Sequence, residues 1–298
     1  MDFLSEIIAL KRQRLAAAKS RLSQEKMRDR AYHFRGGSAS HLLTDALQSY
    51  RGINIIAEFK RRSPSKGNIN SRAEPAALAA IYDSAGAAAI SVLTEEDYFN
   101  GSLDDLRQVR EATRLPILRK DFIIDEYQVY ESAAARADAL LLIVAALDDE
   151  TLTKLRTITE EEMRMDALVE VHTKAEFERA VSCGARLFGV LPAKNLRRLR
   201  FQFFVHRKEM FDLQKQVRVK LPVIIDIFED GIVRADGENL FVFLSLIDHL
   251  QHADGSDGHQ TSGKAGRVDE HEHVQRIAVE TQRARNETIV AGVVHGRI

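Results

Sequence analysis

The chain has 298 residues, of which 45% are apolar and 29% are charged, and 43 Lys plus Arg residues nearly balance 44 Asp plus Glu residues, for a net charge of -1. This composition is typical of a globular protein and excludes a collagen-like, disulfide-rich or wholly disordered chain. The near-zero charge gives no support for a nucleic acid or a membrane as partner, and no run of about 18 apolar residues predicts a membrane span.

The N-terminal segment combines apolar residues at helical spacing with charged ones, which predicts an amphipathic helix over about residues 2–30. Because Asp2 and Glu6 interrupt its apolar residues, we expect no signal peptide here. The one cysteine, Cys183, cannot form an internal disulfide. A reducing compartment is the simplest explanation, so we expect a cytoplasmic protein.

Short apolar runs then alternate with segments that have helical periodicity. The expected strands are 53–59, 88–93, 116–118, 139–144, 167–171 and 187–190, and the expected helices are 75–83, 102–113, 126–136, 148–159 and 174–183. This alternation predicts βαβ units and a parallel sheet, and strands that are apolar throughout indicate burial on both faces. Both a (β/α)8 barrel and an open doubly wound sheet fit, and the lack of a glycine fingerprint after the first strand favours the barrel.

Charged residues stand at the ends of several of these strands. Glu58 and Lys60 alternate around Phe59, so their side chains point to the same side, while Lys120 follows the third strand and Glu170 lies within the fifth. In a parallel barrel the chemistry lies at the carboxyl ends of the strands. Two lysines and two glutamates on one rim could tune a lysine to act as an acid and a glutamate to act as a base. The alternative is a set of structural ion pairs.

The loop after the first strand, residues 61–67, is basic, carries Ser63 and ends in Gly67. Cationic and hydroxyl groups of this kind fit the binding of a phosphate or a carboxylate. A solvated basic loop has the same composition, so composition alone does not decide between the two.

Five segments, taken in order, carry a more specific signal. They are IIAEFKRRSPSKGNI (55–69), ISVLTEEDYFNGSLDDL (90–106), LPILRKDFIIDEYQVYE (115–131), ADALLLIVAAL (137–147) and ALVEVHT (167–173). Over about residues 1–190 the chain resembles the indole-3-glycerol phosphate synthase family. The resemblance implies a (β/α)8 TIM barrel with an N-terminal helical extension. It also implies a carboxy-lyase of tryptophan biosynthesis that converts 1-(2-carboxyphenylamino)-1-deoxyribulose 5-phosphate to indole-3-glycerol phosphate, with loss of carbon dioxide and water and with no metal and no organic cofactor.

The resemblance also implies catalytic roles for the four charged residues. Lys120 would be the general acid on the carbonyl oxygen of the substrate and on the departing hydroxyl, and Lys60 would hold the anthranilate carboxylate. Glu58 and Glu170 would orient the lysines and remove or relay protons during the dehydration. The division of proton transfers among these four residues stays open.

Further residues are implied as substrate contacts. Phe99 would pack on the anthranilate ring, and Ser63 would contact the substrate near its phosphate. The segment VIIDIFEDGI (223–232) is similar to the end of the seventh strand of the family. It adds Glu229 as a catalytic candidate and Gly231 as a substrate-binding candidate.

After Val190 the chain departs from the family pattern. The family continues with Asn-x-Arg-(Asp/Asn)-Leu, whereas residues 191–196 read LPAKNL, and the run 240–250 has no glycine for the expected phosphate site. We therefore expect a barrel domain over residues 1–250 with atypical last two βα units. A low-complexity linker and tail of unknown role is expected over residues 251–298.

Closure of a barrel would require two more strands, and segments 222–228 and 240–247 are apolar enough to supply them. We expect the region after 190 to be a divergent barrel end, a frameshift product or a fused segment, and the abrupt change of composition slightly favours the frameshift. A catalytically impaired remnant of the enzyme is an alternative function, which the missing Asn-x-Arg motif and the missing glycine support. Another phosphate-binding barrel enzyme of the tryptophan pathway is a further alternative. As partner we expect a small phosphorylated molecule, with no nucleic acid and no membrane, and a monomer or weak oligomer.

Overall fold

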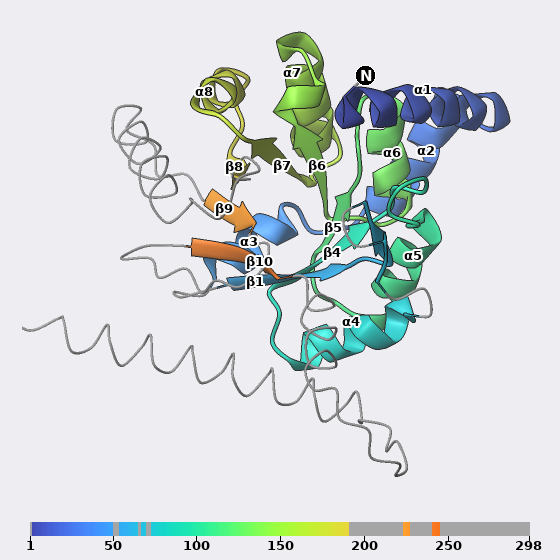
Figure 1. Ribbon diagram of the computed structural model, residues 1–298. Coiled ribbons are helices and arrows are strands. Elements are labelled where there is room, and N and C mark those ends of the chain that lie inside the picture. The colour runs from blue at the N-terminus through green and yellow to red at the C-terminus, as the bar shows by residue number, and fades with distance from the viewer. Residues whose placement is uncertain are drawn as a thin grey trace, which may run out of the picture.

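The computed structural model describes residues 2–49, 54–64, 67–69 and 73–190, together with the backbone of 223–226 and 240–244. The strands of its main sheet are β1 (Asn54–Phe59), β4 (Ala89–Leu93), β5 (Ile117–Lys120), β6 (Ala139–Ile143), β7 (Asp166–Val171), β8 (Leu187–Val190), β9 (Val223–Asp226) and β10 (Leu240–Leu244). They close into a barrel in the order β1-β10-β9-β8-β7-β6-β5-β4 (Figure 1). The predicted (β/α)8 architecture is confirmed.

Helices connect the strands and surround the sheet. They are α1 (Phe3–Arg21), α2 (Gln24–Arg35), α3 (Leu42–Gln48), α4 (Pro75–Ser84), α5 (Leu103–Ala112), α6 (Glu126–Ala134), α7 (Asp149–Thr157) and α8 (Lys174–Ser182). A π-helical turn, Ile158–Glu162, extends α7, and a small hairpin of β2 (Arg62–Ser63) and β3 (Gly67–Asn68) follows β1. Side chains cap the amino ends of four connecting helices, namely Ser102, Asp125, Asp148 and Thr173. The five helices expected between residues 53 and 190 are all present.

The N-terminal extension differs from the prediction. A single helix over residues 2–30 is wrong, because the chain forms two helices separated at Leu22 and Ser23. Leu22 has extended backbone, and the Ser23 hydroxyl accepts a hydrogen bond from the backbone N–H of Lys26. Serine side chains that satisfy the first free N–H groups favour a new helix start over continuation of the previous helix.

The amino ends of the strands are covered by α3, which the apolar periodicity did not predict. The Asp166 carboxylate at the start of β7 accepts hydrogen bonds from the backbone N–H groups of Leu43 (2.9 Å) and Thr44 (3.1 Å). Leu43 and Leu47 are fully buried against the interior residues of the barrel, where each contributes about 1.5–3 kcal/mol. This end of the barrel is therefore filled by side chains, and the carboxyl ends of the strands are the side available to a site.

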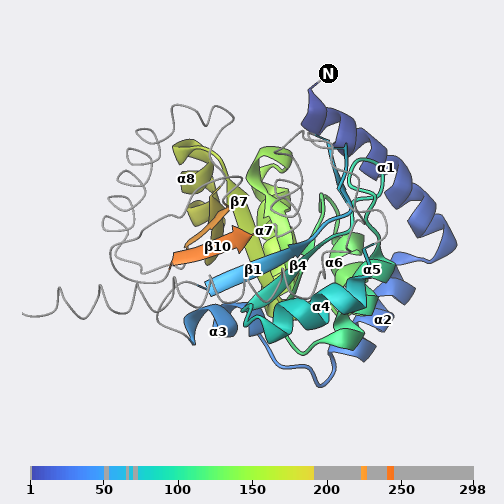
Figure 2. The ribbon, with the colours of Figure 1, turned by 60° about the horizontal axis from the view of Figure 1, so that its bottom comes forward.

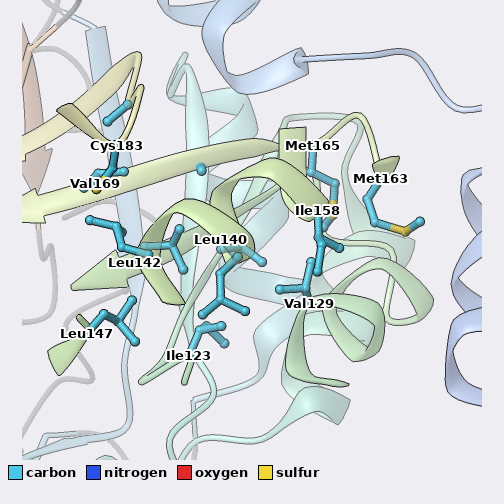
Figure 3. Close-up of a cluster of buried hydrophobic side chains, with 14 of the residues drawn as sticks. Ile123, Val129, Leu140, Leu142, Leu147, Ile158, Met163, Met165, Val169 and Cys183 are labelled. Carbon is cyan, nitrogen blue, oxygen red and sulfur yellow. The ribbon is translucent and has the colours of Figure 1, made fainter. Parts of the chain in front are cut away.

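A second core lies between the outer face of the sheet and the helices. Leu140 and Leu142 of β6 and Val169 of β7 pack there, together with side chains of α6 and α7 (Figure 3). Leu141 and Leu168, one residue along each strand, belong instead to the interior of the barrel. Both faces of these strands are thus apolar, as their sequences indicate.

Strands β9 and β10 complete the sheet. β9 pairs in parallel with β8 and β10, and β10 pairs in parallel with β1; Figure 2 shows β10 and β1 side by side. The prediction that segments 222–228 and 240–247 supply the last two strands is confirmed. The expected linker and tail, 251–298, lies outside the described residues and stays a prediction.

Candidate active site

Three of the predicted residues meet at the carboxyl end of the barrel. Lys60 Nζ lies 2.8 Å from Glu58 Oε1, and Lys120 Nζ lies 2.8 Å from Glu58 Oε2. Glu58 and Lys60 are each only 4% exposed, whereas Lys120 is partly exposed. The pairing of β1 with β4, and of β4 with β5, brings these strand ends together. One carboxylate thus holds two ammonium groups at the rim.

The charge state of Glu58 follows from this geometry. Burial raises the pKa of a carboxyl group because it disfavours the charged form. Here the hydrogen-bonded ammonium groups of Lys120 and Lys60 outweigh burial and lower the pKa of Glu58 to about 2. Glu58 is therefore a carboxylate at neutral pH, suited to hold the lysines and poorly suited to accept a proton while both contact it.

Glu170 lies on β7, opposite Ile143 of β6 and Gly189 of β8, and is 8% exposed. Its Oε1 lies 3.4 Å from Nε2 of His172. His172 is itself held by Glu176, whose Oε2 accepts the backbone N–H of His172 at 2.8 Å and lies 3.3 Å from its Nδ1. Glu170 was among the residues predicted from the sequence, and His172 was not. His172 follows Glu170 by two residues, so its side chain lies on the same side of the strand, and this spacing could have indicated it.

The loop between β4 and α5 carries Phe99 and is built around a buried carboxylate that the sequence reasoning also missed. Glu95, 2% exposed, accepts hydrogen bonds from the backbone N–H groups of Asp97 (3.0 Å), Tyr98 (2.7 Å) and Phe99 (3.1 Å). Its backbone oxygen accepts the N–H of Gly101 at 2.8 Å. These contacts hold the backbone at Phe99 in place.

Gly101→Ala should disrupt this loop. A Cβ at Gly101 would lie 2.2 Å from the carbonyl oxygen of Leu93 and 2.8 Å from its carbon, and backbone atoms of a buried strand cannot move aside cheaply. Overpacking of this kind typically costs about 1–3 kcal/mol. Gly37→Ala is the matched control, because nothing lies within 4 Å of a Cβ at that position. Thermal unfolding should show a lower Tm for Gly101→Ala alone; equal Tm values for both variants would contradict the prediction.

The basic loop after β1 contains the hairpin of β2 and β3, in which Ser63 pairs with Gly67. Arg61 NH2 lies 2.7 Å from Asp105 Oδ1, and its NH1 donates to the carbonyl oxygen of Ala73 at 2.8 Å. The Arg61 guanidinium therefore fastens the loop to α5 and to the segment before α4. Ser63 is 7% exposed. The catalytic candidate Glu229 and the substrate-binding candidate Gly231 lie outside the described residues.

A buried ion-pair network adjoins the end of β5. Lys11 Nζ lies 2.7 Å from Asp121 Oδ1 and 3.0 Å from Glu96 Oε2. Arg119 NH2 lies 3.0 Å from Asp121 Oδ2, which also accepts the hydroxyl of Thr94 at 2.7 Å. Burial raises the pKa of Asp121, and the cations of Lys11 and Arg119 outweigh it and lower that pKa to about 2. Asp121, which follows Lys120 in the chain, thus has a cation at each of its two carboxylate oxygens.

Ion pairs join helix α1 to the loops that follow β4 and β5 at the site. Besides Lys11, Arg14 Nε lies 2.7 Å from Asp97 Oδ2, and Lys19 Nζ lies 2.8 Å from Asp125 Oδ1. These contacts place α1 along the loops that follow β4 and β5 (Figure 2). Lys11 is only 5% exposed. It lies four residues after Ile7 and four residues before Leu15, so helical spacing places it on the apolar face of α1. This spacing could have indicated from the sequence that Lys11 is buried.

Acid should destabilise the protein through Glu58 and Asp121. Their folded pKa values of about 2 lie below the ordinary values of 4.5 and 3.8, so the unfolded chain binds these protons first as the pH falls. The stability they contribute is fully present above about pH 4.5 and is lost progressively toward about pH 2. Urea unfolding measured across this window should show a falling free energy of unfolding. A flat profile over the same window would contradict the prediction.

The described residues include one group with the composition of a metal site. Ligand atoms of Glu95, Glu96 and Asp97 lie within 4.8 Å of one another. The Glu95 carboxylate already accepts hydrogen bonds from backbone N–H groups. Lys11 forms an ion pair with Glu96, and Arg14 forms one with Asp97. These contacts explain the cluster as loop structure, so we assign no metal to it.

A sequence model of the indole-3-glycerol phosphate synthase family matches residues 4–237 of this chain. The chain belongs to the indole-3-glycerol phosphate synthase family. The enzyme of that name from Kineococcus radiotolerans is 47% identical over 191 residues, which cover 64% of this chain and 69% of the relative. The enzyme from Mycolicibacterium gilvum is 57% identical over 148 residues, which cover 50% of this chain and 54% of the relative. The chain thus matches about half to two thirds of the length of these relatives.

The family match continues beyond Val190, where the recognisable motifs end, and includes β9. It therefore does not favour the alternative in which everything after residue 190 is unrelated to the family. Among solved structures, a tryptophan synthase subunit alpha from Legionella pneumophila aligns with a TM-score of 0.47 and 15% identity over 72% of this chain and 90% of that chain. No helix among the described residues is long and apolar enough to cross a membrane.

Proposed function

We propose that this chain converts 1-(2-carboxyphenylamino)-1-deoxyribulose 5-phosphate to indole-3-glycerol phosphate, with release of carbon dioxide and water. The observation that carries the proposal is the contact of Lys60 and Lys120 with the two oxygens of Glu58, at the carboxyl end of the barrel in a chain of this family. The ammonium groups of Lys60 and Lys120 are the kind of donors that bind the carboxylate or phosphate of an anionic substrate.

Lys120 is proposed as the general acid for the ring closure. An aromatic carbon attacks the ketone carbon of the substrate, and a proton must reach the ketone oxygen as the new carbon–carbon bond forms. Lys120 suits this role because it stands at the carboxyl end of β5 and its side chain is partly exposed. The more deeply buried Lys60 is assigned to the anthranilate carboxylate. That group leaves as carbon dioxide, and its bonding electrons restore the aromatic ring.

The dehydration then needs an acid for the departing hydroxyl and a base that accepts a proton from the substrate. The low pKa of Glu58 supports a holding role for it. We therefore assign the base to Glu170, whose contact with His172 offers a path for relay of the proton. Glu58 keeps both lysines oriented before the substrate arrives.

The remaining contacts are proposed from the family resemblance. Phe99, on the loop organised by Glu95, would pack against the anthranilate ring, and Ser63, in the hairpin after β1, would lie near the phosphate. Glu229 and Gly231 remain predictions of a further catalytic residue and a further substrate contact. The proposal includes a small phosphorylated substrate as partner, a cytoplasmic location and a monomer or weak oligomer.

Turnover of the substrate by the full chain tests the proposal. Formation of the indole chromophore should follow addition of 1-(2-carboxyphenylamino)-1-deoxyribulose 5-phosphate, and the aldose isomer that a neighbouring isomerase would consume should give no product. A folded chain that forms no indole would contradict the proposal and support a catalytically impaired member of the family. Consumption of the aldose isomer would support the other barrel enzyme of the pathway.

A further inference from the structure

One polar side chain inside the barrel has no hydrogen-bond partner among the residues that the structure describes. Ser91 of β4 is 0% exposed, and its Oγ makes no hydrogen bond there. Leaving a buried hydroxyl unpaired is unfavourable, and such groups in a folded protein call for a specific explanation. Among the described residues, Ser91 therefore makes no hydrogen bond to the ion-pair cluster.

The register of the sheet places Ser91 beside that cluster. Ser91 lies opposite Glu58 of β1 and opposite Leu118 of β5. Ala89, two residues earlier on the same face, belongs to the barrel interior together with Leu118. Neighbouring strands are about 4.8 Å apart. Of the two side chains opposite Ser91, the Glu58 carboxylate is thus the one that can accept a hydrogen bond.

The proposed reaction changes the partners of Glu58. In the structure each carboxylate oxygen of Glu58 faces one lysine, and catalysis requires Lys120 to turn toward the substrate. A carboxylate that is 4% exposed then loses a charged donor in a site with little access to water. The hydroxyl of Ser91 can supply one donor.

We propose that Ser91 is a positioning residue, whose hydroxyl donates to the Glu58 carboxylate when Lys120 turns to the substrate. It keeps Glu58 ionised and in place, so that Lys120 can return to it after each proton transfer. The kinetic part of this inference rests on the proposed function. Its structural part depends only on the departure of Lys120 from Glu58 and can be tested without activity.

The structural test is a double-mutant cycle between Ser91→Ala and Lys120→Ala, read by thermal unfolding. In the otherwise unchanged chain, Ser91→Ala removes an unpaired buried hydroxyl, so the Tm should stay the same or rise by about 2 °C. In the Lys120→Ala background the same change should lower the Tm by about 2 °C or more, because it removes the donor that replaces Lys120. A crystal structure of Lys120→Ala should place Ser91 Oγ within about 3.2 Å of a Glu58 carboxylate oxygen.

The kinetic test uses the full chain and its proposed substrate. Ser91→Ala should lower kcat about 10-fold with little change in KM, and Ser91→Thr, which keeps a hydroxyl, should retain more of the kcat. Lower activity without lower stability separates positioning from a merely structural role. The proposal is overturned if Ser91→Ala shifts the Tm equally in both backgrounds or leaves kcat unchanged. Absence of turnover in the unchanged chain would refute the proposed function alone, and the double-mutant cycle would still decide the role of Ser91.

Discussion

Lys120→Ala should lower kcat by about 10²-fold or more, because loss of a general acid typically has an effect of that size. The ammonium group of Lys120 contacts Glu58 at the rim, where a proton can pass to a ketone oxygen of a bound substrate. Lys154→Ala is the matched control: Lys154 is also paired with a glutamate, Glu126, at 3.1 Å, but its side chain is 56% exposed and lies on α7. The control should keep the activity of the unchanged chain.

Lys120→Arg separates the loss of the positive charge from the loss of a transferable proton. Arginine keeps the positive charge and can still contact Glu58, but it does not release its proton in proteins. We expect this variant to fold with a Tm close to that of the unchanged chain and to show a kcat nearly as low as that of Lys120→Ala. Full activity in either variant would refute the assignment of Lys120 as the acid.

Lys11→Met should lower the free energy of unfolding by about 3 kcal/mol, as removal of one partner from a buried ion pair typically does. The side chain of Asp121 is 0% exposed and would keep Arg119 as its only cation among the described residues. Arg14→Ala is the matched control on the same helix, because Arg14 is 46% exposed. An exposed pair contributes only about 0–1 kcal/mol.

Denaturant unfolding of both variants compares these two kinds of ion pair directly. A large decrease in the free energy of unfolding for Lys11→Met, with a small decrease for Arg14→Ala, would show that the buried Lys11 fixes α1 to the barrel. Equal, small losses would show that packing of the helix, and not the contact with Asp121, fixes α1 against the loops. The result bears on the site, because Asp121 follows Lys120 in the chain.

The barrel could be predicted because its strands are apolar on both faces and its helices amphipathic, and both patterns are local. The convergence of Glu58, Lys60 and Lys120 was also predictable, since alternation along a strand and the parallel direction of the strands determine it. Helix α3 was not predictable in this way. It has 7 residues, and its first N–H groups are satisfied by Asp166, 123 residues away from Leu43.

The electrostatics of the site could be predicted only in part. The presence of two lysines and two glutamates indicated mutual tuning of their pKa values, but not which carboxylate would face both lysines. Glu58 does so, and Glu170 contacts His172. The position of Ser91 opposite Glu58, where its hydroxyl has no hydrogen-bond partner in the described part of the chain, depends on the register between β1 and β4. No local pattern in the sequence reveals that register.

Release of the substrate carboxyl group as carbon dioxide follows directly from the roles assigned to Lys60 and Lys120. The full chain would be mixed in excess with substrate carrying ¹³C in its carboxylate, and labelled carbon dioxide and indole product would be measured in the same sample. Equal amounts of the two products are expected, and both should be lost in Lys120→Ala. Binding of the substrate to the folded chain without release of the label, or release that is unaffected by Lys120→Ala, would contradict these roles.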